Sequence, residues 1–304
     1  MPRTVGDAWK ATGFSVTPTS ATEVMATLGA IGAYSTGQRF AWRGMSSADY
    51  TVEASIQRAQ ARENLLGDEA TVRERELDTL RRARNWGLGV GRYGVIDDLQ
   101  LLADLQHYGV PTRLVDFTSN PMTALWFACQ DPSADGVSKT GLLLALNVTG
   151  WPVHSSGDAP LTLGNLTSPW ANTLEQSLTG DPFLVRTVEP NVRAAAQEGY
   201  FVAGRVPEGH VGVFRSFSVP FEPLPQGTLE FDGERGRGAP RRLPFVAVLI
   251  KSSLKSKLLR YLDGSYDRSA RTLFPDFPGF REFGTAVGGG EPSAAVEIVD
   301  SGEE

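Results

Sequence analysis

The segment from Gln106 to Asn120 holds the densest group of chemically competent side chains in the sequence. His107 supplies an imidazole and Asp116 a carboxylate, two of the group types that most often exchange protons in enzymes. Arg113 supplies a guanidinium, which can bind a phosphate or a carboxylate through two parallel hydrogen bonds. The segment therefore has the groups for acid–base chemistry and for anion binding.

The end of this segment has the pattern of a strand that runs into a helix. Residues 112–117 are β-branched and aromatic enough for a strand, and Pro121 suits the first position of a helix. Between them, Thr118, Ser119 and Asn120 are residues of the types that cap helices. Together with the free N–H groups of the first turn, their side chains would form an anion site that fits a phosphate.

A purely structural explanation exists for each of these groups. Arg113 and Asp116 can pair with each other or satisfy buried backbone groups. The helix predicted before Gly109 has His107 in its last turn, where the helix dipole favours a histidine. Residues 118–120 can simply cap their own helix. Both interpretations of the segment stay open on the residues alone.

Arg43 is the second candidate for chemistry. It lies in the segment Phe40-Ala41-Trp42-Arg43-Gly44, whose aromatic residues and final glycine predict a short strand followed by a turn. This prediction puts a guanidinium at the end of a strand, where a ligand can reach it.

Apolar periodicity and capping residues predict the elements that carry these groups. The predicted helices are Ala21–Ala33, one long helix over Arg58–Trp86, one from Asp97 or Asp98 to just before Gly109, Pro121–Gln130, and one from Ser252 that stops at Gly264. The predicted strands are Arg39–Gly44, Thr112–Phe117, Gly141–Val148 and Phe245–Ile250. The pattern indicates an α+β fold in which a mixed central sheet has flanking helices.

One large domain with additions is expected. The additions are a helical segment over residues 1–36 and a disordered acidic tail over residues 284–304, on either side of a domain over residues 37–283. Two stretches, Trp151–Pro182 and Gly233–Arg242, have the composition of long loops. The alternating signs of Arg73-Glu74-Arg75-Glu76 predict a solvated helix surface.

The bulk composition excludes disordered and fibrous proteins. With 41% hydrophobic residues, 21% charged residues and a net charge of -6, the chain is an ordinary globular protein without broad affinity for nucleic acid through its overall charge. Cys129 is expected in the core. His154 and His210 have no metal-binding spacing, so no metal site is expected. The apolar runs are too short to cross a membrane, which favours the cytoplasm and no membrane partner.

Four segments in order resemble those of the FRG domain family. They are Phe40-Ala41-Trp42-Arg43-Gly44, the stretch Gln106 to Asn120, the stretch Arg193-Ala194-Ala195-Ala196-Gln197-Glu198-Gly199-Tyr200-Phe201, and Leu273-Phe274-Pro275-Asp276-Phe277-Pro278-Gly279. The resemblance implies an intracellular bacterial protein from a toxin or phage-defence context, with a neutralising partner in the case of a toxin.

The order of these residues also resembles that of mono-ADP-ribosyltransferases, more distantly. This second resemblance implies the ADP-ribosyltransferase fold, NAD as the substrate and a macromolecular acceptor, either protein or nucleic acid. Arg43 would hold the pyrophosphate of NAD, and Thr118 and Ser119 would orient the ribose. The residues expected to complete the nucleotide site are Gly44, Tyr108, Arg113 and Asn120, and those expected at the reacting bond are Glu198, Gln197, His107 and Asp116.

The position of the late carboxylate departs from the enzyme pattern, because Gln197 and Glu198 are adjacent. Neighbouring residues of a strand face opposite ways, so only one of the two is expected to face the cleft. Two other functions stay open: a non-catalytic module that recognises a nucleotide, a nucleic acid or a protein, and a metal-independent nuclease or hydrolase that uses His107 and Asp116.

Overall fold

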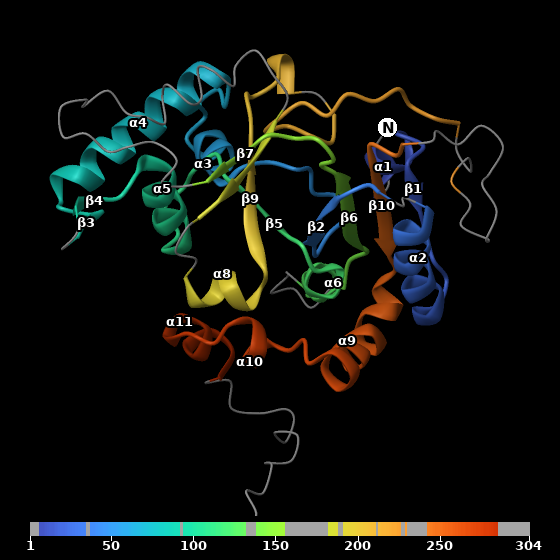
Figure 1. Ribbon diagram of the computed structural model, residues 1–304. Coiled ribbons are helices and arrows are strands. Elements are labelled where there is room, and N and C mark those ends of the chain that lie inside the picture. The colour runs from blue at the N-terminus through green and yellow to red at the C-terminus, as the bar shows by residue number, and fades with distance from the viewer. Residues whose placement is uncertain are drawn as a thin grey trace, which may run out of the picture.

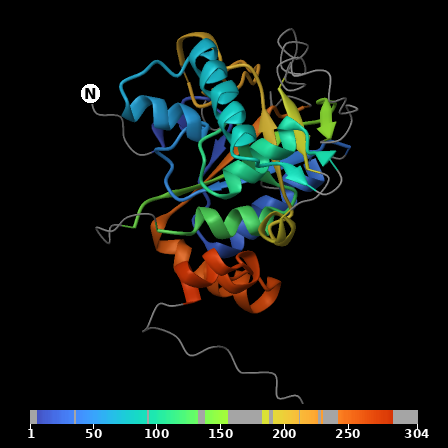
Figure 2. The same cartoon turned by 90° about the vertical axis from the view of Figure 1, so that its left-hand side faces the viewer.

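A computed structural model describes residues 6–34, 37–91, 94–131, 138–155, 182–187, 191–210, 212–225, 229 and 242–284. A central sheet crosses the molecule, and helices flank it (Figure 1). Seen after a quarter turn, the C-terminal helices lie beyond one end of the sheet (Figure 2). The predicted α+β architecture, with a mixed sheet and flanking helices, is confirmed.

The main sheet has eight strands in the order β1-β10-β6-β2-β5-β9-β8-β7. The strands are β1 (Ser15–Val16), β2 (Phe40–Met45), β5 (Val115–Thr118), β6 (Gly141–Asn147), β7 (Val153–Ser155), β8 (Phe183–Arg186), β9 (Gly199–Ala203) and β10 (Phe245–Ile250). The sheet is mixed because β1 runs parallel to β10 and β7 parallel to β8, whereas the other neighbours are antiparallel. A separate hairpin pairs β3 (Val90–Gly91) with β4 (Gly94–Val95).

The helices lie toward both edges of the sheet and at one of its ends (Figure 1). They are α1 (Asp7–Lys10), α2 (Ala21–Tyr34), α3 (Ser55–Arg62), α4 (Glu69–Asn85), α5 (Asp98–His107), α6 (Pro121–Ala128), α8 (Val192–Ala196), α9 (Ser252–Tyr266), α10 (Ala270–Leu273) and α11 (Phe277–Gly279), with the short turns η1 (Glu208–His210) and η2 (Phe280–Gly284). Helices α3, α4 and α5 lie toward one edge of the sheet, whereas α2 and α9 lie toward the other (Figure 1).

Two apolar clusters hold the fold together. The larger one joins β2, β6 and β10 to α2, α6 and α9, and the buried residues of β6 and β10 belong to it. The smaller one joins α4 and α5 to β8 and β9 through residues such as Leu102, Leu114, Phe183 and Phe201. Burial of large apolar side chains is the dominant stabilising contribution in such clusters, at roughly 1.5–3 kcal/mol per side chain.

Helix α6 packs directly onto the sheet because two glycines face it. A Cβ atom at Gly44 of β2 would lie 1.8 Å from the carbonyl oxygen of Ala124, and one at Gly141 of β6 would lie 2.0 Å from that of Ala128. Both distances are impossible for real atoms, so glycine is required at each position for this close approach. The glycine that ends the Trp42-Arg43-Gly44 motif therefore fixes where α6 lies.

Three predicted elements need correction. The long helix over Arg58–Trp86 is wrong, because it is two helices: α3 ends at Arg62, and Asp68 caps a new helix by accepting a hydrogen bond from the Thr71 N–H at 2.9 Å. The predicted strand Thr112–Phe117 becomes β5, which begins at Val115. The last long helix passes Gly264 and ends where Asp267 takes a left-handed conformation, with φ 52°.

Other predictions are confirmed within a residue or two. The helices from Ala21, Asp98, Pro121 and Ser252 begin as predicted, and Phe245–Ile250 matches its predicted strand at both ends. Cys129 is buried, and burial raises the pKa of its thiol to about 12.

None of the described helices is both long and apolar enough to cross a bilayer. The predicted tail beyond Gly284, most of Trp151–Pro182 and nearly all of Gly233–Arg242 lie outside the described residues.

Candidate functional site

A pocket of about 350 Å³ lies among strands β2, β5 and β9 and helices α5, α6 and α8. Its volume is within the range of roughly 300–1,000 Å³ that is usual for small-molecule sites. Phe274, between α10 and α11, completes one wall. The C-terminal elements α10 and α11 are next to α8 at this end of the molecule (Figure 1).

The pocket brings together most of the predicted site residues. Its lining includes six of them: Arg43, Gly44, His107, Asp116, Thr118 and Gln197. Strand pairing brings Arg43 close to Thr118, because Trp42 of β2 is the register partner of Thr118 in the neighbouring strand β5. This register puts Arg43 beside the end of β5, although the two segments are far apart in the sequence. Arg43 and Thr118 line one pocket as expected, whereas Ser119, expected with them, does not line it.

Arg43 is largely buried, and only some of its N–H groups have hydrogen-bond partners among the described residues. Its Nη1 donates to the backbone carbonyl of Asp116 at 2.5 Å, and the same atom lies 3.8 Å from the Asp116 carboxylate. Its Nε–H is buried and has no hydrogen-bond partner among the described residues, and its side chain is 19% exposed. Burial lowers the pKa of Arg43 from its ordinary value, and Asp116 opposes that shift. Because a guanidinium keeps its charge in proteins, Arg43 offers the pocket an incompletely paired cation.

His107 and Asp116, the predicted acid–base pair, line the same pocket but have different partners. Asp116 accepts a hydrogen bond from the Gln106 amide at 2.9 Å. The Nε2 atom of His107 lies 3.9 Å from the carboxylate of Asp276. Burial, and then the charge of Arg193, lowers the pKa of His107, which makes the neutral imidazole the dominant form at neutral pH.

Arg193 and Asp276 join the two later segments of the chain at the pocket. The Nε and Nη2 atoms of Arg193 donate to the two carboxylate oxygens of Asp276 at 2.9 and 2.8 Å. Asp276 also accepts a hydrogen bond from the Gly279 N–H at 2.7 Å. The hydrogen bonds from Arg193 are the largest cause that lowers the pKa of Asp276. The guanidinium of Arg193 also lies over the Phe274 ring, 4.8 Å from its centre.

Asn120 caps α6, whereas the hydroxyls of Thr118 and Ser119 bond to the segment before β9. The Thr118 hydroxyl donates to the Gln197 carbonyl at 2.7 Å and accepts from the Asn120 N–H at 3.0 Å. The Asn120 side chain accepts from the N–H groups of Met122 at 2.9 Å and Thr123 at 3.4 Å. The predicted open anion site at the start of α6 is thus occupied by the side chain of Asn120. Of these three residues, Thr118 lines the pocket, whereas Ser119 and Asn120 lie outside its lining.

Gln197 and Glu198 do not lie in a strand, which corrects the expected geometry. Gln197 ends α8, and Glu198 takes a left-handed conformation, with φ 51°, before β9 begins at Gly199. Gln197 lines the pocket and donates to the carbonyl of Leu273 at 3.0 Å.

The Glu198 carboxylate lies outside the pocket lining. It accepts hydrogen bonds from Arg268 and from the Asn120 side chain, both at 2.8 Å, and its side chain is 44% exposed. The structure therefore does not bring Glu198 together with Arg43.

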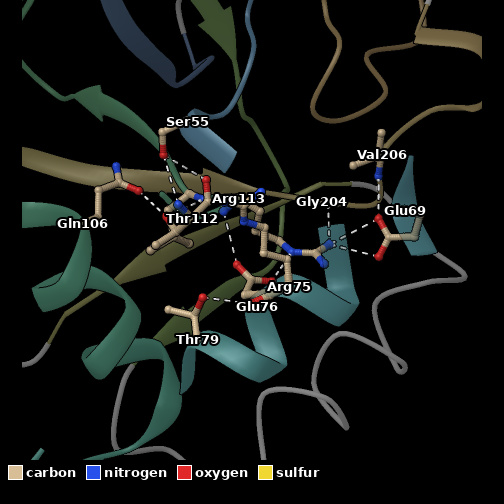
Figure 3. A network of polar contacts seen from close by, with 11 residues as sticks. Ser55, Glu69, Arg75, Glu76, Thr79, Gln106, Thr112, Arg113, Gly204 and Val206 are labelled. Atoms are coloured by element: carbon tan, nitrogen blue, oxygen red, sulfur yellow. Dashed lines mark hydrogen bonds and ion pairs between the residues drawn. The ribbon is translucent and has the colours of Figure 1, made fainter. Parts of the chain in front are cut away.

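Arg113 belongs to a buried network away from the pocket (Figure 3). Its Nε donates to Glu76 at 2.6 Å and its Nη1 to Glu69 at 3.0 Å, and its side chain is 2% exposed. Burial alone would lower the pKa of Arg113, but the two carboxylates raise it overall. The expected nucleotide-binding role of Arg113 is not supported by this placement. Glu76, predicted on a solvated surface, is buried with it.

Two further expectations concern Tyr108 and metal ions. Tyr108 caps the end of α5 with its side chain exposed and lies outside the pocket lining. Within the described part of the chain, no three His, Cys, Asp or Glu side chains gather in a way that could hold a metal ion.

The sequence does not single out several of the residues that line the pocket. Arg193 and Phe274 lie in segments that resemble family motifs, so those motifs pointed to the right regions without naming the residues. Thr123 and Phe127 are on the pocket side of α6, and their identities are those of ordinary helix residues.

Part of the chain matches a known protein family. Residues 38–136 match the family model described as FRG domain. That range contains Arg43, His107 and Asp116 of the pocket, whereas Arg193 and Phe274 lie beyond it. No curated protein and no solved structure matches the sequence.

Proposed function

We propose that this chain, which carries an FRG domain, is an ADP-ribosyltransferase-like enzyme that uses NAD to modify a macromolecular acceptor. The observation that supports the proposal most is the state of Arg43: a largely buried guanidinium with an unpaired Nε–H in a pocket of ligand size. Such a group favours an anionic ligand, since a buried donor without a partner is costly.

In the proposed complex, the pyrophosphate of NAD lies against Arg43. The backbone contact of Nη1 with Asp116 orients the guanidinium, and the 19% of the side chain that is exposed is the part that a ligand can reach. Thr118 and Gln197 stay joined by their hydrogen bond and form the adjacent wall. The aromatic rings of Phe127 and Phe274, which also line the pocket, offer flat apolar surfaces for a planar ring such as nicotinamide or adenine.

The proposed reaction breaks the bond between nicotinamide and the ribose C1′ atom. Nicotinamide leaves with the bonding electron pair, the sugar passes through an oxocarbenium-like state, and the acceptor nucleophile attacks C1′ and gives up its proton. The neutral imidazole of His107 is suited to take that proton. Asp116 is the carboxylate of the pocket lining that can stabilise positive charge on the sugar.

The FRG resemblance adds a biological setting to this proposal. We propose a role in a bacterial toxin or phage-defence system in the cytoplasm, where a neutralising partner would block the pocket. The acceptor, a protein or a nucleic acid, would approach from the open side of the pocket.

A transfer assay with labelled NAD tests the proposal. Wild-type protein incubated with bacterial lysate should label a macromolecule and release nicotinamide. Arg43→Ala should reduce labelling by about 10- to 100-fold, the loss expected for a charge-assisted hydrogen bond. Arg43→Lys should also be weak, because lysine cannot make the two-pronged contact.

The matched control is Arg82→Ala, an exposed arginine on α4 that pairs with Asp78. It should label at the wild-type rate. Wild-type protein that neither transfers label nor releases nicotinamide would contradict the proposal, as would equal activity in Arg43→Ala.

A non-catalytic nucleotide-binding module is the second candidate, and one observation favours it. Glu198 is bonded to Arg268 and Asn120 outside the pocket lining, so the late carboxylate of the enzyme pattern is not available as it stands. Calorimetry with NAD and ADP-ribose separates the candidates. A binding module should bind both ligands without any release of nicotinamide.

A further inference from the structure

Thr123 carries a buried hydroxyl group that has no hydrogen-bond partner among the described residues. The residue is fully buried in the first turn of α6 and lines the pocket beside Arg43 and Thr118. Since water does not reach the hydroxyl, its hydrogen-bonding capacity is lost in the free protein. A buried polar group in this state is uncommon in folded proteins and destabilises them.

Other helices of this chain show how a threonine in the same position is normally satisfied. Thr71 in α4 and Thr272 in α10 occupy, like Thr123, the third helical position. The Thr71 hydroxyl bonds to the side chain of its cap, Asp68, at 2.7 Å. The Thr272 hydroxyl contacts its cap, Ser269, at 3.2 Å. The Thr123 hydroxyl makes no such contact with its own cap.

The usual local acceptors do not pair with the Thr123 hydroxyl. The Asn120 side-chain oxygen accepts two backbone N–H groups of the first turn and no hydroxyl. Threonines deeper in a helix can bond to the carbonyl four residues earlier, as Thr27 does with Glu23 at 2.8 Å. For Thr123 that carbonyl belongs to Ser119, and the Thr123 hydroxyl makes no hydrogen bond to it.

We propose that Thr123 is a ligand-recognising residue whose hydroxyl pairs with a neutral polar group of the bound molecule. Arg43 selects an anion and Thr123 a hydroxyl or carboxamide, so together they select an anionic ribosyl nucleotide. This inference rests on the proposed function, since NAD and ADP-ribose combine these groups. A change between staggered χ1 rotamers reorients the hydroxyl relative to the pocket that Thr123 lines.

A pair of substitutions at this position tests the inference through two measurements. Thr123→Val keeps the shape and removes the hydroxyl, whereas Thr123→Ser keeps the hydroxyl. Thermal unfolding of the ligand-free proteins is compared first. Thr123→Val should raise Tm by roughly 2–4 °C, because it removes an unsatisfied buried group. A fall in Tm for Thr123→Val would show that the hydroxyl has a partner in the free protein and would overturn the inference.

Calorimetry with ADP-ribose is the second measurement. Thr123→Val should bind about tenfold more weakly than wild type, and Thr123→Ser should bind within about threefold of it. A stabilised variant that binds more weakly is a result that a merely structural threonine cannot give. Equal affinity of Thr123→Val and wild type overturns the inference.

The binding experiment also separates this inference from the proposed function. Suppose that wild type binds ADP-ribose, that Arg43→Ala abolishes this binding and that Thr123→Val retains it. The role of Thr123 is then refuted, while the proposed function stands. If wild type binds neither ADP-ribose nor NAD, both fall together.

Discussion

Replacement of Glu76 by Gln should destabilise the protein strongly, although Glu76 lies in a charge-rich helix segment. Its carboxylate receives the Arg113 Nε–H at 2.6 Å and the Arg113 backbone N–H at 3.1 Å, and it is 1% exposed. Glutamine has nearly the same size, so the change removes charge without leaving a cavity. Arg113 then keeps Glu69 as a counter-charge, with contacts at 3.0 and 3.2 Å.

The size of the effect follows from the geometry of this network. Loss of one partner from a buried ion pair costs about 3–5 kcal/mol, because the remaining charge is left without full compensation. Glu69 still compensates part of the charge, so a loss of about 3 kcal/mol in the free energy of unfolding is expected.

Urea unfolding, followed by tryptophan fluorescence, measures this loss. Glu63→Gln is the matched control, because Glu63 makes a similar bidentate pair with Arg75, at 2.7 and 2.8 Å, on the protein surface. The control should unfold at the wild-type urea midpoint, since exposed ion pairs contribute little. If Glu76→Gln were as stable as Glu63→Gln, the account of Arg113 as a structural residue would be refuted.

Three further outcomes are expected. Gly44→Ala should lower the free energy of unfolding by about 1–3 kcal/mol in a urea titration, because its Cβ must displace α6; a neutral result would contradict the close packing. His107 has a lowered pKa in the folded protein, so its contribution to stability is full above pH 6.5 and is lost as the pH falls through the folded pKa. His107→Asn should therefore flatten the pH dependence of unfolding below pH 6.5, and an unchanged slope would argue against it. Asp276→Asn should lower the pKa of His107 further in an NMR titration, since Asp276 favours the charged imidazole; a rise would show that the assigned cause is wrong.

The sequence predicts the central strands and most helix starts because their signals are local. The run Phe245–Ile250 is apolar throughout, and a strand buried on both faces needs no more than that. Asp97 and Asn120 begin helices through side-chain caps that are visible in the sequence. The sequence pattern does not reveal the break before α4, because apolar periodicity continues across it. The break is marked only by Asp68, which caps α4 by accepting a hydrogen bond from the Thr71 N–H.

The site was predictable only in part, because its partners come from distant segments. Arg43 and Arg113 both lie in predicted strands, and nothing local shows which of them faces the pocket. The carboxylates that remove Arg113 from the pocket, Glu76 and Glu69, lie 37 and 44 residues earlier in the chain. In the same way, Arg268 lies 70 residues after Glu198 and holds it outside the pocket lining.

A crystal structure of the protein with ADP-ribose would show whether Arg43 and Thr123 bind a nucleotide. We expect the nucleotide to occupy the pocket, with a phosphate oxygen at the Arg43 guanidinium and a ribosyl hydroxyl within hydrogen-bond distance of Thr123. A nucleotide bound elsewhere on the molecule, or one in the pocket that leaves Arg43 without contact, would contradict this expectation.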